Sequence, residues 1–178
     1  MKLQDFFINT TEQKILSFLA QNLGKSFFDK EVAQRTKISR GATNKALREL
    51  AKNGLVIKQK RGRMNFYQAN AANPVLKEFK VLRNIIQLFP LIKKLKKTSE
   101  KIILFGSTSR GENYKDSDID LFILTHNKES VKKMVKKSKI KPLQLIIKTP
   151  TEFINLEKKD PTFYQEIIRG IILWERYE

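Results

Sequence analysis

The spacing of apolar residues in the first seventy positions predicts three helices followed by a pair of strands. Three stretches have apolar residues placed to face inward in a helix, and each has a residue at or just before its start that can cap the helix. These stretches cover residues 10–23, 30–36 and 39–53, with Thr10 or Thr11, Asp29 and Ser39 as the capping residues. Two strand-like runs, 55–60 and 64–69, then lie on either side of a turn centred on Gly62 and predict a β-hairpin.

A fourth, longer helical pattern connects this region to the rest of the chain. Asn73 and Pro74 are typical of a helix start, and apolar residues recur at helical spacing as far as Phe89. Pro90 is expected to kink or end this helix. The apolar face has two interpretations: it pairs two subunits in a homodimer, or it packs against the flanking domains of its own chain.

The remaining residues mix short apolar runs with helical patterns and predict a small domain of the α+β class. Strands are expected at 102–105, 118–124, 143–148 and 171–174. Helices are expected over 128–139, after a cap at Thr149 or Thr151, and from Asp160 and Pro161 to Gly170. The outer side of the helix 128–139 is strongly basic. It is either a solvated face or a surface that holds a polyanionic substrate.

The composition excludes several kinds of site. The 178 residues include no cysteine and one histidine, which excludes disulfides, thiolate metal sites and a zinc site built on histidines. Asp5, Asn9 and Glu12 interrupt the first residues, so we expect no signal peptide. No uncharged run reaches the roughly 20 residues that a membrane span needs. We therefore expect a cytoplasmic protein with no membrane partner.

Positive charge is concentrated in the first part of the chain. The net charge is +18, and residues 1–97 contain 21 Lys and Arg against 6 Asp and Glu. Residues 98–178 contain 15 against 12. This asymmetry predicts a nucleic-acid-binding half joined to a nearly neutral half. General lysine enrichment for solubility or high temperature would not produce such an imbalance.

Two aspartates at the start of the strand 118–124 indicate metal chemistry. Successive side chains of a strand point to opposite faces, so Asp118 and Asp120 share one face and Ile119 points to the other. Each carboxylate raises the cost of ionising the other unless a cation neutralises them. Mg²⁺ takes a few carboxylate oxygens and leaves its other positions to water and substrate phosphates.

A Gly-Ser turn stands ahead of these aspartates. Gly106 permits a close approach of the backbone to a ligand, and Ser107 would begin a helix whose free N–H groups attract anions. The turn and the aspartates enclose ten residues, and the two segments read GSTSRGE (106–112) and SDIDL (117–121). At these residues the chain resembles the nucleotidyltransferase superfamily that includes DNA polymerase beta. These two segments most closely resemble the motif of the small minimal nucleotidyltransferase group.

This resemblance implies the transfer of a nucleoside monophosphate from an NTP, with ATP expected, to an acceptor hydroxyl. It implies that Asp118 and Asp120 are catalytic and hold Mg²⁺ or Mn²⁺. It also implies that Gly106 and Ser107 bind the terminal phosphates and that Arg110 offsets charge there. The minimal group includes members paired with small toxin proteins that they modify. A protein acceptor or toxin partner, and an antitoxin-like role, are therefore expected.

Residues 10–70 resemble a winged helix-turn-helix along their whole length. This resemblance implies binding to double-stranded DNA, with the third helix in the major groove and the hairpin, or wing, against phosphates. The expected contacts come from the outward side of the third helix and from the wing: Arg40, Thr43, Asn44, Lys45, Arg48, Lys58, Lys60, Arg61 and Arg63. A protein-interaction module with a solvated basic face is the alternative.

These resemblances divide the chain into three parts and leave two functions open. We assign residues 1–70 to a winged helix-turn-helix domain, 71–97 to a connecting helix and 98–178 to a minimal nucleotidyltransferase domain with a small mixed sheet. Active members of the superfamily carry a third carboxylate on the strand corresponding to 143–148, where this chain has Gln144, and Glu152 is the nearest acid. Loss of a general base costs about 10²–10⁴-fold in rate. The protein is therefore either an active, Mg-dependent nucleotidyltransferase or a transcriptional regulator with a degenerate, non-catalytic nucleotidyltransferase domain.

Overall fold

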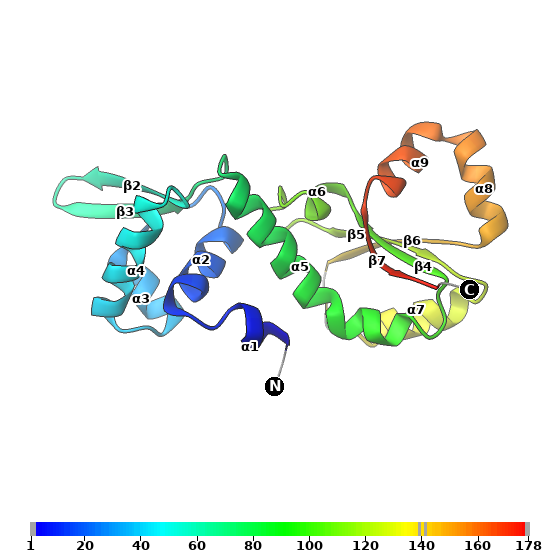
Figure 1. The fold of residues 1–178 in the computed structure, drawn as a ribbon, viewed down its shortest axis with the longest axis horizontal. Helices are drawn as coiled ribbons and strands as arrows, with labels where there is room; N and C mark the ends of the chain where they lie inside the picture. Colours follow the sequence, from blue (N-terminus) through cyan, green and yellow to red (C-terminus); the bar gives the residue numbers. More distant parts are fainter. Residues whose placement is uncertain (1–2, 139, 141, 177–178) are drawn as a thin grey trace. The chain divides into compact units, whose positions relative to one another are not determined.

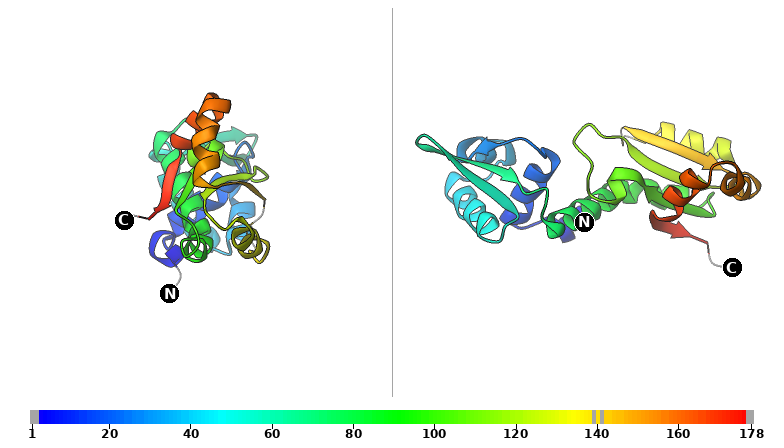
Figure 2. Two further views of the ribbon diagram at one scale, coloured as in Figure 1. Left: turned by 90° about the vertical axis from the view of Figure 1, so that its right-hand side faces the viewer. Right: turned by 90° about the horizontal axis from the view of Figure 1, so that it is seen from above.

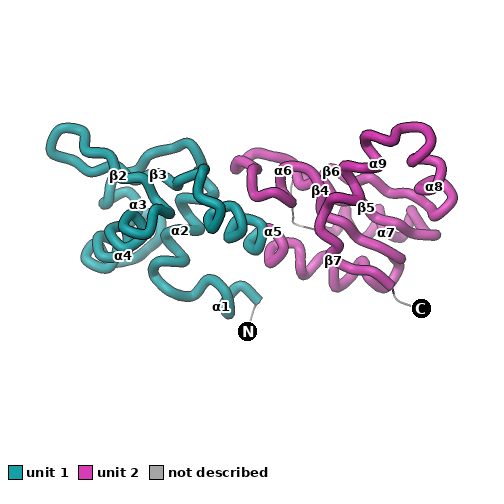
Figure 3. The backbone as a smooth tube through the Cα atoms, turned by 45° about the horizontal axis from the view of Figure 1, so that its top comes forward, with its two compact units in different colours: residues 1–83 teal, residues 84–178 magenta. Residues whose placement is uncertain are grey.

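The chain forms two compact units, each with its own hydrophobic core. The structure is a computed structural model that describes residues 3–138, 140 and 142–176. Unit 1 comprises residues 1–83 and unit 2 residues 84–178 (Figure 3). The boundary lies inside the predicted connecting helix, and the three-part division at residues 70 and 97 stays a prediction. Among the described residues, no helix has both the length and the apolar character to cross a membrane.

Unit 1 combines helices with a three-stranded antiparallel sheet. In chain order its elements are α1 (Leu3–Phe7), α2 (Thr11–Gln21), β1 (Phe27–Phe28), α3 (Asp29–Thr36), α4 (Arg40–Lys52), β2 (Val56–Arg61) and β3 (Met64–Ala69) (Figure 1). The sheet order is β1-β3-β2. The three predicted helices and the hairpin are confirmed, whereas the sequence pattern did not predict the short strand β1.

Side-chain caps fix where these helices begin. Thr10 accepts a hydrogen bond from a backbone N–H of α2 as part of a capping box. Ser39 caps α4 by accepting a hydrogen bond from a backbone N–H of that helix at 3.4 Å. The residue before α3 is Phe28, whose backbone N–H donates to Glu31 Oε2 at 3.1 Å. The sequence had suggested Asp29 as the cap of α3, but in the structure Asp29 is the first residue of this helix.

The core of unit 1 determines which side of α4 remains free. Ile15 and Leu19 of α2 are fully buried, and Leu47 of α4 packs with them. The sheet contributes Val56 and Tyr67 to the same cluster. Because one side of α4 is held in this core, its opposite side is left exposed beside the β2–β3 hairpin.

Helix α5 (Pro74–Leu95) contributes to the cores of both units. Asn73 Oδ1 accepts hydrogen bonds from two backbone N–H groups of the first turn and caps the helix. Leu76 belongs to the core of unit 1 and Leu88 to the core of unit 2. The helix continues beyond Pro90, so the expectation that this proline could end it is wrong; three apolar residues that follow it are buried in the core of unit 2. The apolar face thus packs within its own chain, and subunit pairing stays a prediction.

Unit 2 contains a four-stranded mixed sheet. After α5 its elements are β4 (Lys101–Phe105), α6 (Gly106–Ser109), β5 (Ile119–Leu124), α7 (Lys128–Lys136), β6 (Leu143–Lys148), α8 (Pro150–Lys159), α9 (Pro161–Ile168) and β7 (Ile171–Glu175). The strand order is β6-β5-β4-β7, and β5 and β6 are the parallel pair. The predicted α+β class with a small mixed sheet is confirmed. The predicted helix 128–139 ends at Lys136, and Lys139 lies outside the described residues.

Helices cover both faces of this sheet, α5 and α7 on one side and α8 and α9 on the other (Figures 1 and 2). Alternation along the strands explains the two layers. Leu104 and Leu121 point to the α5 and α7 side, whereas Phe105 and Phe122 point to the side where Ile167 of α9 is buried. The neighbouring strand residues therefore show on which face of the sheet a side chain at the end of β4 or β5 lies.

Candidate functional site

The two aspartates lie at the start of β5, on the face that α8 and α9 cover. Asp118 directly precedes the strand and Asp120 is its second residue. Ile119 is buried in the core on the α5 and α7 side, so strand alternation directs both carboxylates to the other face. Asp120 pairs in register with Phe105, whose side chain lies in the core beside α9.

The turn after β4 brings its backbone against Asp120. Gly106 has a φ of +66°, in the left-handed region that glycine adopts at little cost. A Cβ atom at this position would overlap Asp120 Oδ2. The Gly-Ser turn and Asp120 therefore meet in space, and the absence of a side chain at Gly106 leaves space for the Asp120 carboxylate.

Hydrogen bonds from α6 connect the turn to the start of β5. The buried hydroxyl of Thr108 donates to the backbone carbonyl of Asp118 at 3.2 Å. Ser109 Oγ donates to the carbonyl of Gly106 at 2.8 Å. These two bonds hold both halves of the motif in place without using the aspartate side chains.

A buried asparagine from α5 supports the same segment. Asn84 Nδ2 donates to the carbonyl of Thr108 at 3.0 Å and to Asn113 Oδ1 at 3.1 Å. The sequence pattern predicts neither Asn84 nor the positioning role of Thr108. No sequence signal points to Asn84, because it lies 24 residues before its partner Thr108 and the pattern of its helix does not show what the helix packs against.

The charges around Asp120 largely oppose its ionisation. Burial raises the pKa of Asp120, the negative charges of Glu166 and Asp118 raise it further, and the charge of Arg110 lowers it, so that the pKa lies above its ordinary value. Arg110 Nε is 2.9 Å from Glu112 Oε2 in an exposed ion pair. A cation bound at Asp120 would oppose these effects and favour the ionised carboxylate.

The structure identifies a third acidic side chain near this site, but on a helix rather than on a strand. Gln144 of β6 pairs in register with Asp120, so an amide occupies the strand position beside it. Phe163 of α9 packs edge-on against Phe105 with ring centroids 6.0 Å apart, and Glu166 follows it by one helical turn on the same side. The sequence pattern does not predict Glu166, because the periodicity of α9 does not reveal which face of the sheet this helix covers.

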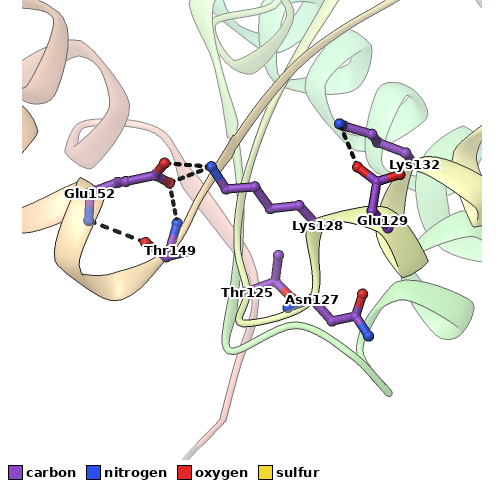
Figure 4. A network of polar contacts seen from close by, with 7 residues as sticks. All are labelled: Thr125, Asn127, Lys128, Glu129, Lys132, Thr149 and Glu152. Carbon is purple, nitrogen blue, oxygen red and sulfur yellow. Dashed lines mark hydrogen bonds and ion pairs between the residues drawn. The ribbon is translucent and has the colours of Figure 1, made fainter.

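Glu152 belongs to the opposite end of the sheet. It lies in the first turn of α8, just after β6 ends at Lys148. Its carboxylate accepts hydrogen bonds from Lys128 Nζ at 2.6 Å and from the backbone N–H of Thr149 at 2.8 Å (Figure 4). The hydrogen bond from Lys128, and then that from Thr149, lower the pKa of Glu152 to about 2. Glu152 is therefore engaged in capping α8 and is remote from the paired aspartates.

The donor set at the aspartates fits a hard divalent cation. Asp118 and Asp120 provide carboxylate oxygens, and across the ranges that the structure describes no group of three or more Asp, Glu, His or Cys could hold a metal ion. Mg²⁺ accepts this arrangement, because it binds through one or two carboxylates and keeps its other positions for water and phosphate oxygens.

Unit 1 contains a second site, an open hollow of about 820 Å³ between α4 and the β2–β3 hairpin. Five of the nine residues predicted to contact DNA line it: Arg40, Asn44, Arg48, Lys58 and Arg63. Lys45, Lys60 and Arg61 are exposed but do not line it. Arg61 lies over the ring of Phe66, 4.9 Å from its centroid.

Thr43 is the exception among the predicted DNA contacts. Its side chain is fully buried, so the expectation that it projects outward is wrong. The helical phase explains the difference, because Thr43 shares the inward side of α4 with Ala46, Leu47 and Leu50.

An acidic residue that was not predicted for this site also lines the hollow. Asp29 Oδ2 accepts a hydrogen bond from Arg40 Nε at 3.2 Å. Burial raises the pKa of Asp29, but hydrogen bonds from Arg40, from the backbone of Lys30 and from Asn44 outweigh that effect and lower it. Asp29 therefore holds Arg40 and Asn44 in the hollow.

These two sites define a class of protein. A helical unit with a basic hollow beside a hairpin, joined to a mixed sheet with paired aspartates after a Gly-Ser turn, is a DNA-binding domain fused to a nucleotidyltransferase domain. The family model described as polymerase beta, nucleotidyltransferase matches residues 87–178, more than half of the chain, and the chain belongs to this family. A model described as winged helix-turn-helix DNA-binding matches residues 8–57, which confirms the predicted fusion. No curated protein matches the chain in sequence.

Proposed function

We propose that the protein binds double-stranded DNA through unit 1 and, through unit 2, transfers a nucleoside monophosphate from an NTP to an acceptor hydroxyl. ATP is the proposed donor. The observation that supports the transferase activity is the close approach of Asp120 to the turn at Gly106, where only a glycine leaves space for its carboxylate.

Each residue of the motif has a role in this proposal. Asp118 and Asp120 would hold Mg²⁺ or Mn²⁺, which when bound neutralises charge on the triphosphate and polarises its oxygens. Gly106 and Ser107 would bind the terminal phosphates through the backbone N–H groups of the turn. Arg110 would offset the negative charge there. The bonds that Thr108 makes keep these groups in register before the substrate arrives.

The transfer needs a base for the proton of the acceptor. The acceptor oxygen bonds to the α-phosphorus, the bond from that phosphorus to the bridging oxygen breaks, and pyrophosphate leaves with the electron pair. The hydroxyl proton goes to a carboxylate, and we assign this role to Glu166. It lies one helical turn after Phe163, which packs against Phe105, the residue in register with Asp120, and its negative charge raises the pKa of Asp120.

The DNA-binding part of the proposal rests on the basic hollow of unit 1. Arginine and asparagine side chains on α4 reach base edges when such a helix enters the major groove, and lysine and arginine side chains on the hairpin contact phosphates. We also propose that the protein is cytoplasmic. For the transferase, the proposed acceptor is a hydroxyl group of a partner protein in an antitoxin-like pair, as the resemblance to the minimal group implies.

Nucleotide transfer is tested by labelling. The protein is incubated with α-³²P-labelled NTPs, Mg²⁺ or Mn²⁺ and cell lysate, and label on a macromolecule is the expected result. Asp118→Asn and Asp120→Asn should abolish it, whereas Asp116→Asn, which changes an exposed carboxylate in the same loop, should not. Labelling that survives both substitutions would refute the proposed site.

The second candidate is a transcriptional regulator whose nucleotidyltransferase domain is non-catalytic. The observation that favours it is Gln144, which stands in register with Asp120 where active relatives have a carboxylate. Binding to a duplex with the protein's own promoter, combined with no labelling under any nucleotide or metal condition, would establish this function instead. The pair Arg61→Gln and Arg63→Gln should weaken that binding if the wing contacts phosphates.

A further inference from the structure

Unit 2 has a strongly basic surface that neither proposed activity uses. The end of α5 with the turn after it (93–97) and α7 with its following residue (128–137) carry nine lysines and one acidic residue, Glu129. On the other side of the sheet, α8 and α9 with Arg169 (150–169) carry four acidic residues and three basic ones. The excess of lysine is therefore confined to one face of unit 2. We call it the lysine surface.

The two segments belong to one continuous surface. Leu95 of α5 and Val131 of α7 are buried in the same core under the sheet. Thr98, which follows the first segment, donates its hydroxyl to Met134 Sδ at 3.9 Å. Apolar residues thus hold α5 and α7 together on their inner sides, and the lysines of the two segments are exposed, apart from the half-buried Lys128.

Most of these lysines have no acidic partner. Lys128 pairs with Glu152 and Lys132 pairs with Glu129. In the part of the chain that the structure describes, the other seven form no ion pair: Lys93 and Lys96, which lie over aromatic rings, and Lys94, Lys97, Lys133, Lys136 and Lys137. The surface therefore carries unneutralised positive charge that attracts a polyanion.

The chemistry of the surface selects the kind of polyanion. None of the exposed large apolar side chains lies in either segment, so the surface lacks the anchors that protein interfaces use. Lys93 and Lys96 lie over the rings of Phe89 and Trp174, which leaves those ring faces covered and not free for stacking with unpaired bases. Lysine ammonium groups with no free aromatic face beside them suit the regularly spaced phosphates of a nucleic-acid duplex.

We infer that the lysine surface binds the phosphate backbone of duplex DNA, as a second and sequence-independent contact that supports the winged helix of unit 1. This inference rests on the DNA binding proposed for unit 1. Because both units belong to one chain, DNA held by unit 1 is presented to unit 2 at a high effective concentration, and weak lysine contacts then add to the affinity of the whole chain.

The test measures how the affinity of the full chain for duplex DNA depends on salt. One variant carries Lys133→Gln, Lys136→Gln and Lys137→Gln, and the matched control carries Lys158→Gln, Lys159→Gln and Arg169→Gln on the opposite face. Both remove three exposed positive charges from unit 2. The slope of log K against log salt should fall by about 0.9 for each phosphate that the first variant no longer neutralises, up to about 2.7, and should stay unchanged in the control.

Three outcomes would overturn the inference. A wild-type slope in the first variant means that the surface does not contact DNA, and an equal fall in the control means that only net charge matters. If the first variant loses affinity for structured RNA but not for duplex DNA, the partner is RNA instead. In each case Arg61→Gln with Arg63→Gln would still weaken DNA binding if unit 1 binds DNA, whereas a wild-type chain that binds no duplex refutes the proposed DNA binding itself.

Discussion

The space beside Asp120 depends on a single missing side chain. Gly106 combines a left-handed backbone with a close approach of the Asp120 carboxylate, so a methyl group there is unfavourable for two separate reasons. Gly24 also has a positive φ, +82°, but nothing lies within 4 Å of the Cβ that it lacks. The pair separates backbone strain from steric displacement of the aspartate.

Gly106→Ala and Gly24→Ala should therefore differ in function but share a stability cost. Both are expected to lose about 1–2 kcal/mol of unfolding free energy through the left-handed residue. Only Gly106→Ala should also lose nucleotide binding and label transfer, because its Cβ displaces Asp120. Denaturant unfolding and nucleotide titration of both variants measure these effects, and an active Gly106→Ala protein would show that the turn does not shape the site.

Asp120 is expected to lower the stability of the free protein at neutral pH. Its folded pKa is raised above the ordinary value of 3.8, so between these two pKa values the folded state binds more protons than the unfolded state. Stability therefore falls as the pH rises through that window, and the ionised side chain costs free energy above it.

Asp120→Asn should for this reason raise the melting temperature at pH 7, with no gain near pH 3, while it abolishes nucleotide transfer. Asp116→Asn, at an exposed position of the same loop, is the control and should change neither property. Thermal unfolding in the absence of metal at the two pH values is the measurement. A variant that is less stable at pH 7 would contradict the electrostatic account of Asp120.

Glu166 is expected to act in the chemical step and not in binding. Glu166→Gln removes the proposed proton acceptor and a negative charge that opposes Asp120, so the transfer rate should fall by about 10²–10⁴-fold, with affinity for the metal-bound nucleotide unchanged or higher. Glu157→Gln on α8 serves as the control. Single-turnover labelling and nucleotide titration separate the two effects, and full activity in Glu166→Gln would leave the base unassigned.

At the scale of elements, the start of α8 depends on one glutamate with two partners. Glu152 completes a capping box with Thr149 and pairs with Lys128 of α7 (Figure 4). Its pKa of about 2 lies below the ordinary 4.5, so its contribution to stability is present above pH 4.5 and is lost as the pH falls towards 2.

Glu152→Gln keeps an N3 side chain that can complete the capping box, but it removes the ion pair, and Glu152→Ala removes both. We expect the melting temperature at pH 7 to decrease in that order and the difference to vanish near pH 2. Label transfer should remain at the wild-type level, because the residue lies at the far end of the sheet from the aspartates. If the soluble, folded Glu152→Gln protein lost label transfer, Glu152 would have to be the third carboxylate of the site.

Periodicity and capping residues predicted most of this fold. Thr10, Ser39, Thr149 and Asp160 cap helices that begin where the sequence indicated. These sequence signals failed where tertiary packing decides the outcome. Thr43 looks polar and therefore exposed, yet the helical phase of α4 buries it, and Pro90 stays inside α5 because the core of unit 2 holds the turns around it. The paired aspartates follow from strand alternation alone, whereas Glu166 and Asn84 reach the site only through the arrangement of α9 and α5 around the sheet.

At the scale of the whole molecule, the chain joins a basic winged helix to a transferase domain whose own charge is polarised. Most acidic residues of unit 2 lie in the loop before β5, at the start of β5 and on or between α8 and α9, and the lysine surface lies on the α5 and α7 side. This arrangement keeps positive charge for DNA on one face of unit 2 and the site for a metal-bound nucleotide on another. The two activities can therefore be removed by separate substitutions.

The central claim is that Asp118 and Asp120 together hold a metal-bound triphosphate beside the Gly106 turn. Calorimetric titration of the protein with a non-hydrolysable ATP analogue, with and without Mg²⁺, tests it most directly because no acceptor is needed. We predict Mg²⁺-dependent binding that weakens by about 10–100-fold in Asp118→Asn and in Asp120→Asn, as for the loss of a charged contact, and that is unchanged in Asp116→Asn. Binding that needs no metal, or equal affinity in all three variants, would contradict the account.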